Sequence, residues 1–451
     1  MDAKIKLIAA TCLVVLILLI ASQLLLFAPT LDSQKQNPDD RAYWLGLARN
    51  AWEYFRPGKG VNAQTGLHSA GLNCPYFADW DLGLYIQSII DAEKLGILNA
   101  SGTWGADERI EKVLTFLEGR ELSSSGLPYL WYDTGTGGRY GNTTTNALDT
   151  GKLLVALQNL KDYRPSLAAR IDLIVYNRTN YEQLKQSLDG TVDSIRIYDY
   201  YAAMGFAHFW PDRFTSVAES ILNNIVSAPT VETYGVKLPV SKLISEALLH
   251  CVFELKPDER LLNLSRQVYL AHEARYNATG KYVAFSEGNT DLGEPTYVYE
   301  WVMYADGQTW QIKPSSFSDA DVSIPPIVFL KTAVGFRAIY NTQFARNMSA
   351  YIESYLPRPI SGYMDGVDEN DRVVTTITDK TNGLIITAAR YAVETNQGPG
   401  SSPAPSSATA GNIGNVSGPS VHAQPFITGN TAKNAASAIG KSKPHSPFGG
   451  C

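Results

Sequence analysis

The sequence is poor in the residues that bind metals or form disulfides. Its 451 residues include four cysteines and six histidines, and these are scattered rather than spaced as zinc ligands are. It also lacks an Asp-x-Asp-x-Asp calcium loop, a Gly-x-Ser-x-Gly motif, a phosphate loop and a dinucleotide fingerprint. These absences argue against zinc enzymes, hydrolases with a nucleophile elbow and nucleotide-dependent enzymes. We therefore expect no metal and no cofactor.

Positive charge is not in excess either. A net charge of −6 and the lack of a basic stripe argue against a nucleic-acid partner. Aromatic residues, in contrast, are abundant, with 25 tyrosines and eight tryptophans against five methionines. Their rings fill cores and also stack on sugar rings, and core filling is the simpler explanation.

The N-terminal segment predicts a membrane anchor. Residues 7–28 are almost wholly apolar and long enough to cross the membrane as a helix. Lys4 and Lys6 precede them, which places the N-terminus in the cytoplasm and the rest of the chain outside. We therefore expect residues 1–30 to be a transmembrane signal anchor. The alternative is cleavage near Ala28, which would give a secreted protein.

Seven Asn-x-Ser/Thr sequons support export, because this motif is the acceptor for N-glycosylation. Such motifs also occur by chance, so we expect only some of them to be occupied in an extracellular glycoprotein. The asparagines are Asn99, Asn142, Asn177, Asn263, Asn277, Asn347 and Asn415.

Composition divides the rest of the chain into three parts. Residues 31–40 form a polar spacer, and residues 397–451 form a Gly/Ser/Pro/Ala/Asn tail that is predicted to be disordered. The folded domain is expected over residues 41–396, with strand-like alternation only in short pieces such as Lys281–Phe285 and Val373–Ile377. Periodicity predicts twelve helices, at 41–56, 80–96, 106–119, 146–161, 163–185, 198–209, 212–226, 239–254, 257–276, 322–340, 342–355 and 382–395.

The lengths of the connections predict how these helices are arranged. Connections after the odd-numbered helices are long, whereas those after the even-numbered helices are short. Alternate connections of an up-down array lie at the same end, so the long ones should gather on one face and tight turns should close the other. Twelve helices in six hairpins indicate an all-α (α/α)6 toroid, with its functional residues on the long-loop face.

Two further expectations follow from this arrangement. Gly83 and Gly151 stand early in even-numbered helices, where the missing side chain allows close helix–helix approach. Cys74 lies in a long loop and Cys251 near the opposite end of its helix, roughly a helix length away. We expect no disulfide between them.

Acidic residues are concentrated at the starts of the even-numbered helices and in the long loops. An acid at a helix start is often only a cap, because the helix dipole stabilises it. Aromatic residues interleave with these acids, however, and acids among aromatic rings suit the cleavage of glycosidic bonds. The acids are Asp79, Asp81, Asp133, Asp149, Asp199, Glu287, Asp291, Glu294, Glu300, Asp319, Asp321, Asp365 and Asp379.

Four of these acids are the candidate catalytic residues. Glu300 lies inside an aromatic segment, where burial would raise its pKa, and is the first choice as general acid. An ion pair with Arg275 or Lys281 is the alternative. Asp133 is the second choice, and Asp81 or Asp149 would activate water or stabilise the cationic transition state. The side chains expected to contact the sugar are Trp80, Trp131, Tyr132, Tyr198, Asp199, Tyr299, Trp301, Tyr363 and Asn382.

Short motifs follow one another in order over most of residues 60–395. They are Trp80-Asp-Leu-Gly-Leu-Tyr85, Leu130-Trp-Tyr-Asp133, Asn146-Ala-Leu-Asp-Thr-Gly151, Tyr198-Asp-Tyr-Tyr-Ala-Ala203, Glu294-Pro-Thr-Tyr-Val-Tyr-Glu300, Gly362-Tyr-Met-Asp-Gly366 and Thr381-Asn-Gly-Leu-Ile385. Their order resembles the family called domain of unknown function 3131, which is similar to the glucoamylase-like domain of β-1,2-glucan-active enzymes. The resemblance implies the same (α/α)6 fold and, more loosely, glycan processing.

Together these observations predict a membrane-anchored extracellular glycoside hydrolase or transglycosylase that acts on a polysaccharide or oligosaccharide. The alternative, from another class, is a non-catalytic surface glycoprotein whose toroid is a structural or glycan-binding module. The two differ in geometry. The enzyme requires unpaired carboxylates among aromatic rings, whereas the module predicts acids that are paired with Arg or Lys.

Overall fold

A computed structural model describes residues 38–357 and 360–395 of the chain. The described residues are mostly helical and contain thirteen α-helices and ten short strands. None of these helices is long and apolar enough to cross a membrane. The predicted signal anchor, most of the polar spacer, the low-complexity tail and Asn415 lie outside the described residues.

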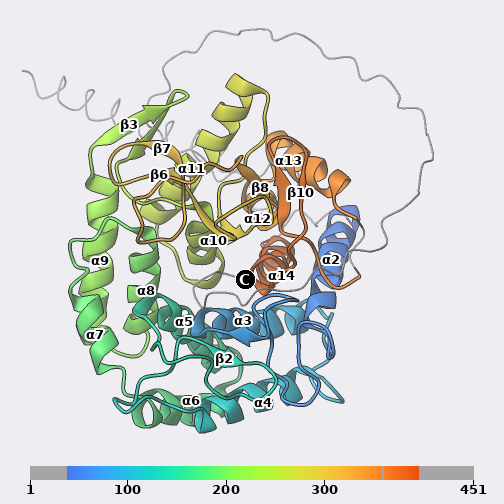
Figure 1. Ribbon diagram of the computed structural model, residues 1–451, viewed down its shortest axis with the longest axis vertical. Helices are drawn as coiled ribbons and strands as arrows, with labels where there is room; N and C mark the ends of the chain where they lie inside the picture. Colours follow the sequence, from blue (N-terminus) through green and yellow to red (C-terminus); the bar gives the residue numbers. More distant parts are fainter. Residues whose placement is uncertain (1–37, 358–359, 396–451) are drawn as a thin grey trace, which may run out of the picture.

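Six helices form an inner ring. Each packs against the next along the chain, and the last returns to the first. Figure 1 looks onto this ring, with the six helices around the centre of the molecule. The inner helices are α3 (Asp79–Lys94), α5 (Ala147–Tyr163), α8 (Ile197–Ala207), α10 (Ser245–Glu254), α12 (Leu330–Tyr340) and α14 (Asp379–Glu394). They correspond to the even-numbered helices of the prediction.

The remaining helices lie outside the ring. One prediction is wrong here: residues 163–185 do not form a single helix, because the side chain of Asn180 accepts the N–H of Glu182 and begins a new helix. A 3-10 turn and a π-helical segment (Leu173–Arg178) precede this break. The outer helices are α2 (Pro38–Trp52), α4 (Ala106–Gly119), α6 (Ala168–Asp172), α7 (Glu182–Asp189), α9 (Pro211–Ser227), α11 (Glu259–Thr279) and α13 (Gln343–Tyr355).

The ten strands form four small antiparallel sheets, so the prediction of an all-α chain was too narrow. The sheets pair β1 with β2, β3 with β4, β6 with β5 and β7, and β9 with β8 and β10. The strands are β1 (Tyr76–Phe77), β2 (Tyr132–Asp133), β3 (Thr230–Thr233), β4 (Val236–Pro239), β5 (Glu287–Asn289), β6 (Tyr297–Met303), β7 (Thr309–Lys313), β8 (Ile327–Phe329), β9 (Gly366–Asp368) and β10 (Val373–Val374).

The sheets shorten two predicted helices at their starts. Residues 239–244 and 322–329 lead into α10 and α12 without being helical, and Pro325 and Pro326 lack the N–H that a helix interior needs. The predicted strand Lys281–Phe285 amounts to one isolated bridge, between Ala284 and Val328.

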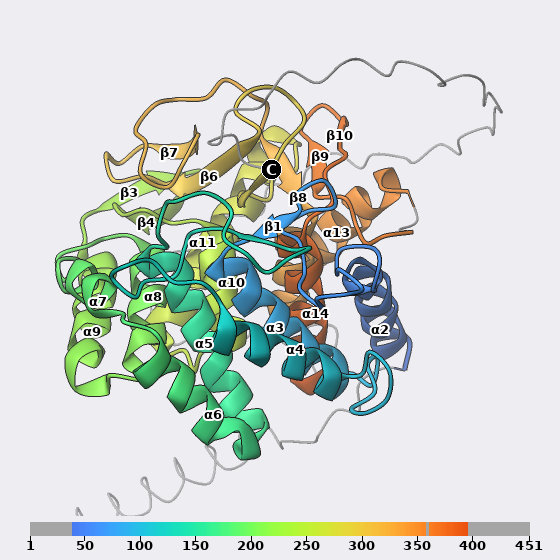
Figure 2. The same ribbon diagram turned by 60° about the horizontal axis from the view of Figure 1, so that its bottom comes forward.

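The strands and long connections lie at one end of the ring. β1, β2, β4, β8 and β10 each precede an inner helix, so they meet at the end where these helices begin. Figure 2 shows this end at the top, with strands above the helices. We call it the near end, and the end where the inner helices finish the far end. The predicted gathering of long loops on one face is therefore observed.

The predictions for Gly83, Gly151 and Cys251 are confirmed. A Cβ on Gly83 would lie 2.8 Å from the backbone of Lys152, and one on Gly151 would lie 2.6 Å from Ala202 Cα. These two glycines therefore let α3, α5 and α8 approach one another. Cys251 is a free, buried thiol in the described part of the chain, so it forms no bridge with Cys74.

Candidate active site

The inner helices bring charged side chains together at the near end. Asp79 and Asp81 lie in the first turn of α3 and Asp149 in that of α5, while Asp379 and Lys380 begin α14. Acids in these positions are stabilised by the free N–H groups of the helix start. Whether they are structural or chemical depends on what each carboxylate contacts.

Asp79 and Asp81 are both committed to strong partners. Asp79 Oδ1 lies 2.5 Å from Arg120 Nη1, and Oδ2 accepts the hydroxyl of Thr150 at 3.2 Å. Asp81 Oδ2 accepts the N–H of Ala78 at 2.8 Å and Oδ1 pairs with Lys380 at 2.5 Å. These ion pairs hold α3 to its neighbours and leave neither acid free to transfer a proton.

Asp149 stands in a different environment. It is partly exposed, and in the described structure its carboxylate receives one side-chain hydrogen bond, from Asn146 Nδ2 at 2.8 Å. Burial and the nearby charges of Asp81 and Asp79 raise the pKa of Asp149 to about 7, against the opposing effects of Lys380 and Asn146. Asp149 can therefore hold a proton near neutral pH and release it, as a general acid must.

Glu287 is another near-end acid for which the described residues provide no ion-pair partner. It lies opposite Tyr299 in the β5–β6 pair and accepts the hydroxyl of Tyr297 at 2.9 Å. Burial and the charge of Glu246 raise its pKa, while Lys331 and Lys380 act in the opposite direction. Glu287 is thus a buried carboxyl between cations that do not pair with it directly.

Tyr299 links these two acids. Its pKa is raised well above the ordinary value by burial, by Glu287 and by Asp149, so both carboxyls lie within electrostatic reach of its hydroxyl. Other aromatic rings lie beside Tyr299. The ring centroid of Tyr198 is 6.4 Å from that of Tyr299 and 5.7 Å from that of Trp80. The near end therefore presents two acids among aromatic rings.

Residues 46–395 match the family model described as a protein of unknown function, DUF3131. The chain belongs to this family. No curated protein sequence matches it significantly. The resemblance seen in the motifs is therefore confirmed.

Solved structures show which fold the DUF3131 domain has. A glucoamylase-like protein from Bacteroides caccae ATCC 43185 is 14% identical, with a TM-score of 0.55 over 78% of this chain and 93% of that one. An endo-β-1,2-glucanase from Talaromyces funiculosus with bound sophorose is 10% identical (TM-score 0.57, 77% and 83%). A third, from Chitinophaga pinensis with sophorotriose and glucose, is 12% identical (TM-score 0.52, 79% and 93%). The domain has the α/α toroid fold of these proteins.

Glu300, the first choice as general acid, lies on the opposite face of β6 from Tyr299 and Trp301, because successive residues of a strand alternate. Its side chain is fully buried, Oε1 accepts the N–H of Ile327 at 2.8 Å, and burial raises its pKa well above the ordinary value. The predicted pKa shift is present, but the carboxyl does not share the ring-facing side with Glu287.

The carboxylates of Asp133 and Asp199 both bond residues close to them in the sequence. Asp133 Oδ1 accepts the N–H and hydroxyl of Thr136 at 2.8 and 2.9 Å, which closes the turn after β2. Asp199 pairs with Arg196 at 2.5 Å and accepts the hydroxyl of Ser194. Neither arrangement leaves an acid directed at the pair formed by Asp149 and Glu287.

The predicted sugar-contacting residues divide into exposed and buried groups. Trp131 and Tyr299 are partly exposed, whereas Trp301 is fully buried in the core. Tyr132 is also buried and donates to the carbonyl of Glu121. Buried Asn382 bonds the backbone of Tyr363 in both directions, so its amide fixes a loop.

Sequence reasoning missed the basic residues of the near end. Lys331 pairs with Glu246 at 2.5 Å, and these two side chains are almost fully buried. Lys380 lies 2.5 Å from Asp81 and 3.9 Å from Asp379. The sequence does carry a signal for Lys380, because this residue directly follows Asp379 at a helix start.

A second buried cluster, which we call the interior ion network, lies deeper in the ring. Glu254 Oε1 lies 2.5 Å from Lys152 Nζ and 2.8 Å from His250 Nδ1, and Tyr201 donates its hydroxyl to Oε2 at 2.5 Å. Burial alone would raise the pKa of Glu254, but Lys152 and His250 hold it well below its ordinary value. Glu246, His250 and Glu254 follow one another at four-residue spacing on α10, a pattern visible in the sequence.

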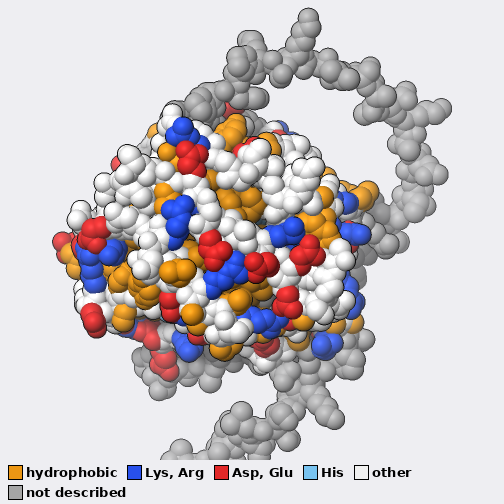
Figure 3. Space-filling view, turned by 90° about the horizontal axis from the view of Figure 1, so that it is seen from below, with side chains coloured by type: hydrophobic (Ala, Val, Ile, Leu, Met, Phe, Trp, Pro, Cys, Tyr) orange, Lys and Arg blue, Asp and Glu red, His pale blue; other side chains and the backbone are white. Residues whose placement is uncertain are grey.

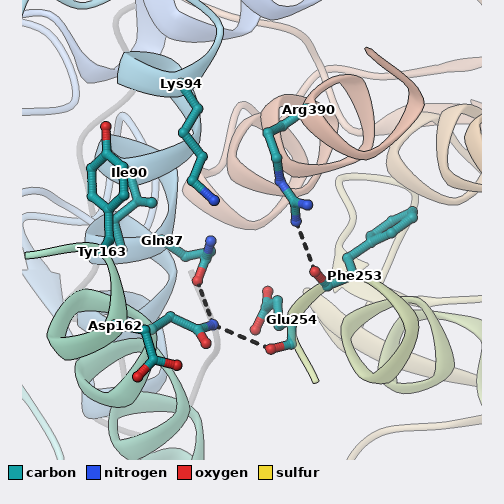
Figure 4. A pocket seen from close by; sticks show the side chains of 9 residues that line it. Gln87, Ile90, Lys94, Asp162, Tyr163, Phe253, Glu254 and Arg390 are labelled. Atoms are coloured by element: carbon teal, nitrogen blue, oxygen red, sulfur yellow. Dashed lines mark hydrogen bonds between the residues drawn. The ribbon is translucent and has the colours of Figure 1, made fainter. Parts of the chain in front are cut away.

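The far end holds a cavity of about 270 Å³. Figure 4 shows Lys94 and Arg390 on one side and Asp162 and Glu254 on the other, with the guanidinium of Arg390 bonded to the carbonyl of Phe253. Oppositely charged groups face each other across it, unlike the acids of the near end. The far end therefore carries a pocket that is partly open to solvent and lined by charged side chains.

One outer face of the molecule carries charged side chains of both signs. In the view of Figure 3, Lys and Arg side chains alternate with Asp and Glu side chains between apolar patches. A nucleic-acid interface needs a continuous basic surface, which this face does not offer.

Proposed function

We propose that this protein hydrolyses glycosidic bonds, with Asp149 as general acid and Glu287 as the second carboxylate. The single observation that carries the proposal is the environment of Asp149, a partly exposed acid whose pKa is raised to about 7. Glycoside hydrolysis needs one carboxyl that is protonated and one that is ionised at the working pH. Burial and Glu246 raise the pKa of Glu287, and Lys331 and Lys380 oppose this shift by favouring its ionised form.

Each residue of the proposed site has a separate role in the reaction. Asp149 protonates the leaving glycosidic oxygen, and Glu287 activates water or stabilises the positive charge that develops on the sugar. Tyr299, between the two acids, orients the sugar through its ring and hydroxyl. Asp81 and Lys380 are positioning residues, since their ion pair supplies part of the field around Asp149.

The relatives support the chemistry and suggest a substrate. Two of the similar structures are endo-β-1,2-glucanases, and their bound ligands are sophorose, sophorotriose and glucose. We propose a β-linked glucan as the first substrate to test. The full chain is incubated with linear glucans of defined linkage, β-1,2-glucan among them, and new reducing ends are measured. Release from at least one glucan is expected, and a folded protein that releases none refutes the hydrolase proposal.

A non-catalytic glycan-binding module is the second candidate, favoured by one observation. Asp79 and Asp81 are paired with Arg120 and Lys380, as this alternative predicted for the near-end acids. Asp149 and Glu287 are not paired in this way, which is why we prefer the enzyme. Glycan binding with no bond cleavage would identify the module.

We also propose that residues 7–28 anchor the protein and that the toroid lies outside the cell. The asparagines of all six sequons in the described residues are exposed, as glycosylation requires: Asn99, Asn142, Asn177, Asn263, Asn277 and Asn347. Membrane fractionation of cells that make the full chain, with and without a deglycosylating treatment, tests both points. A protein found in the soluble cell fraction without a mass shift contradicts them.

A further inference from the structure

Three aromatic side chains at the near end form a cluster that the proposed chemistry does not use. The rings of Tyr76 and Tyr140 are stacked at 4.8 Å with an interplanar angle of 19°, and Trp131 meets Tyr76 edge-on at 5.0 Å. We call these three residues the aromatic platform. Tyr140 is 48% exposed, and the other two are partly exposed.

Backbone contacts hold the platform in place. Tyr76 lies opposite Asp133 in the β1–β2 pair, and Asp133 follows Trp131 by two residues. Tyr140 donates its N–H to the carbonyl of Trp131 at 2.8 Å. The hydrogen bonds of Asp133 with Thr136 close the turn between them. The rings are therefore arranged before any ligand arrives, which limits the entropy lost on binding.

The platform adjoins the acid cluster. Burial, Tyr140 and Asp81 raise the pKa of Tyr76, and Lys380 opposes them, so Tyr76 lies within electrostatic reach of the Asp81–Lys380 pair. Tyr76 also precedes Ala78 by two residues, and the N–H of Ala78 bonds Asp81. A chain of sugars bound at Asp149 could thus continue onto the platform.

Loop anchoring alone does not account for this arrangement. Tyr132, on the same strand as the partner of Tyr76, is fully buried and contributes to the core. Tyr140 leaves nearly half of its surface in water, although a smaller residue would keep its backbone bond to Trp131. A preformed, exposed ring stack is the surface on which the C–H face of a pyranose packs.

We propose that the aromatic platform is a sugar subsite away from the scissile bond, so that the ligand is an extended glycan chain rather than a disaccharide. This inference rests on the proposed function for the location of the scissile bond. Its own content is a dependence of binding on chain length, which can be measured without any turnover.

The test compares binding of linear β-1,2-glucan and of sophorose, with other linear glucans in the same panel. Calorimetry is carried out on the full chain carrying Asp149→Asn, so that no ligand is consumed. Adding Tyr140→Ala should weaken binding of the long chain about tenfold, which corresponds to about 1.4 kcal/mol, and should leave binding of sophorose unchanged. Tyr140→Phe keeps the ring and should retain the affinity.

Tyr234→Ala is the matched control, because Tyr234 is a comparably exposed tyrosine on the β3–β4 turn. It should change neither affinity, and thermal unfolding should show that all variants are folded. Equal binding of long chains by Tyr140→Ala and its parent overturns the subsite, as does a protein that binds no linear glucan of the panel. Chain-length-dependent binding without hydrolysis by the wild type would instead overturn the proposed function and keep the subsite.

Discussion

Asp149 at the near end and Glu254 in the interior ion network are carboxyls whose surroundings shift the pKa in opposite directions. In the network, Glu254 is surrounded by Lys152, His250 and Tyr201, and its pKa is held well below the ordinary value. At the near end, Asp149 has an amide for a partner and like charges for neighbours, and its pKa is raised to about 7.

The difference separates structure from chemistry. A carboxylate matched by cations and donors stabilises the fold only as part of its pair and cannot exchange its proton near neutral pH. A carboxyl that its surroundings keep protonated is suited to acid catalysis. In this toroid Glu254 is paired within the ring, whereas Asp149 at the loop-rich end has no ion-pair partner among the described residues. The following predictions test that separation, from the largest expected effect to the smallest.

Replacing Asp149 should affect catalysis and little else. Asp149→Asn keeps the shape and the bond from Asn146 but removes the proton, so the rate of glycan cleavage should fall by about 10²–10⁴-fold. Stability in urea should be unchanged or higher, because repulsion with Asp81 and Asp79 is removed. Steady-state rates and denaturation curves of the same preparations provide the measurement. A variant with the parent rate would show that Asp149 is not the proton donor.

Replacing Lys152 should affect stability. Lys152→Met leaves the charge of Glu254 buried without its closest partner, and breaking a buried pair in this way costs about 3–5 kcal/mol. Lys161→Met is the control on the same helix, since its pair with Asp172 is partly exposed and should contribute at most about 1 kcal/mol. Urea unfolding of both variants makes the comparison. Equal losses would contradict the distinction between the interior ion network and the surface.

The raised pKa of Asp149 should give both activity and stability a pH dependence. The catalytic rate should fall as pH rises through about 7, because the general acid loses its proton. The folded state also binds this proton more tightly than the unfolded chain, whose Asp has a pKa of about 3.9. This contribution to stability therefore declines as pH rises from about 4 to about 7, and it should be absent from Asp149→Asn. A catalytic rate that does not change up to pH 9 would contradict the assignment.

The smallest effect is expected at Glu300. Glu300→Gln keeps a carbonyl oxygen that accepts the N–H of Ile327. The side chain lies on the opposite face of β6 from Tyr299 and Trp301. Cleavage should stay within about threefold of the parent, because the residue does not touch the proposed sugar path. A loss as large as that of Asp149→Asn would instead restore the sequence-based choice of Glu300 as general acid.

The sequence predicted the scaffold better than the roles of its acids. Helix periodicity and alternating connection lengths were enough to place six inner helices and the loop-rich end, because both are local properties of the chain. The β5–β6–β7 sheet escaped prediction although its strands are consecutive along the chain, because the segment between the predicted helices 257–276 and 322–340 was interpreted as a connection. Because β6 was not predicted, the alternation of side chains along it, which places Glu300 and Tyr299 on opposite faces, was not predicted either.

Ion pairing was the other property that the sequence could not supply. Asp81 and Lys380 are almost the whole domain apart in sequence, yet their side chains meet at 2.5 Å. Nothing local distinguishes Asp81, which is paired, from Asp149, which is not, because both lie in the first turn of an inner helix. The choice between a cap and a catalyst depends on contacts across the ring.

The central claim is that the near end raises the pKa of one carboxyl without an ion-pair partner, Asp149, to about neutral pH. Its most direct test is a ¹³C NMR titration of the Asp149 carboxyl in the full chain, with the signal assigned by its loss in Asp149→Asn. We predict a midpoint at about pH 7. A midpoint near 4, the ordinary value for aspartate, would contradict the account.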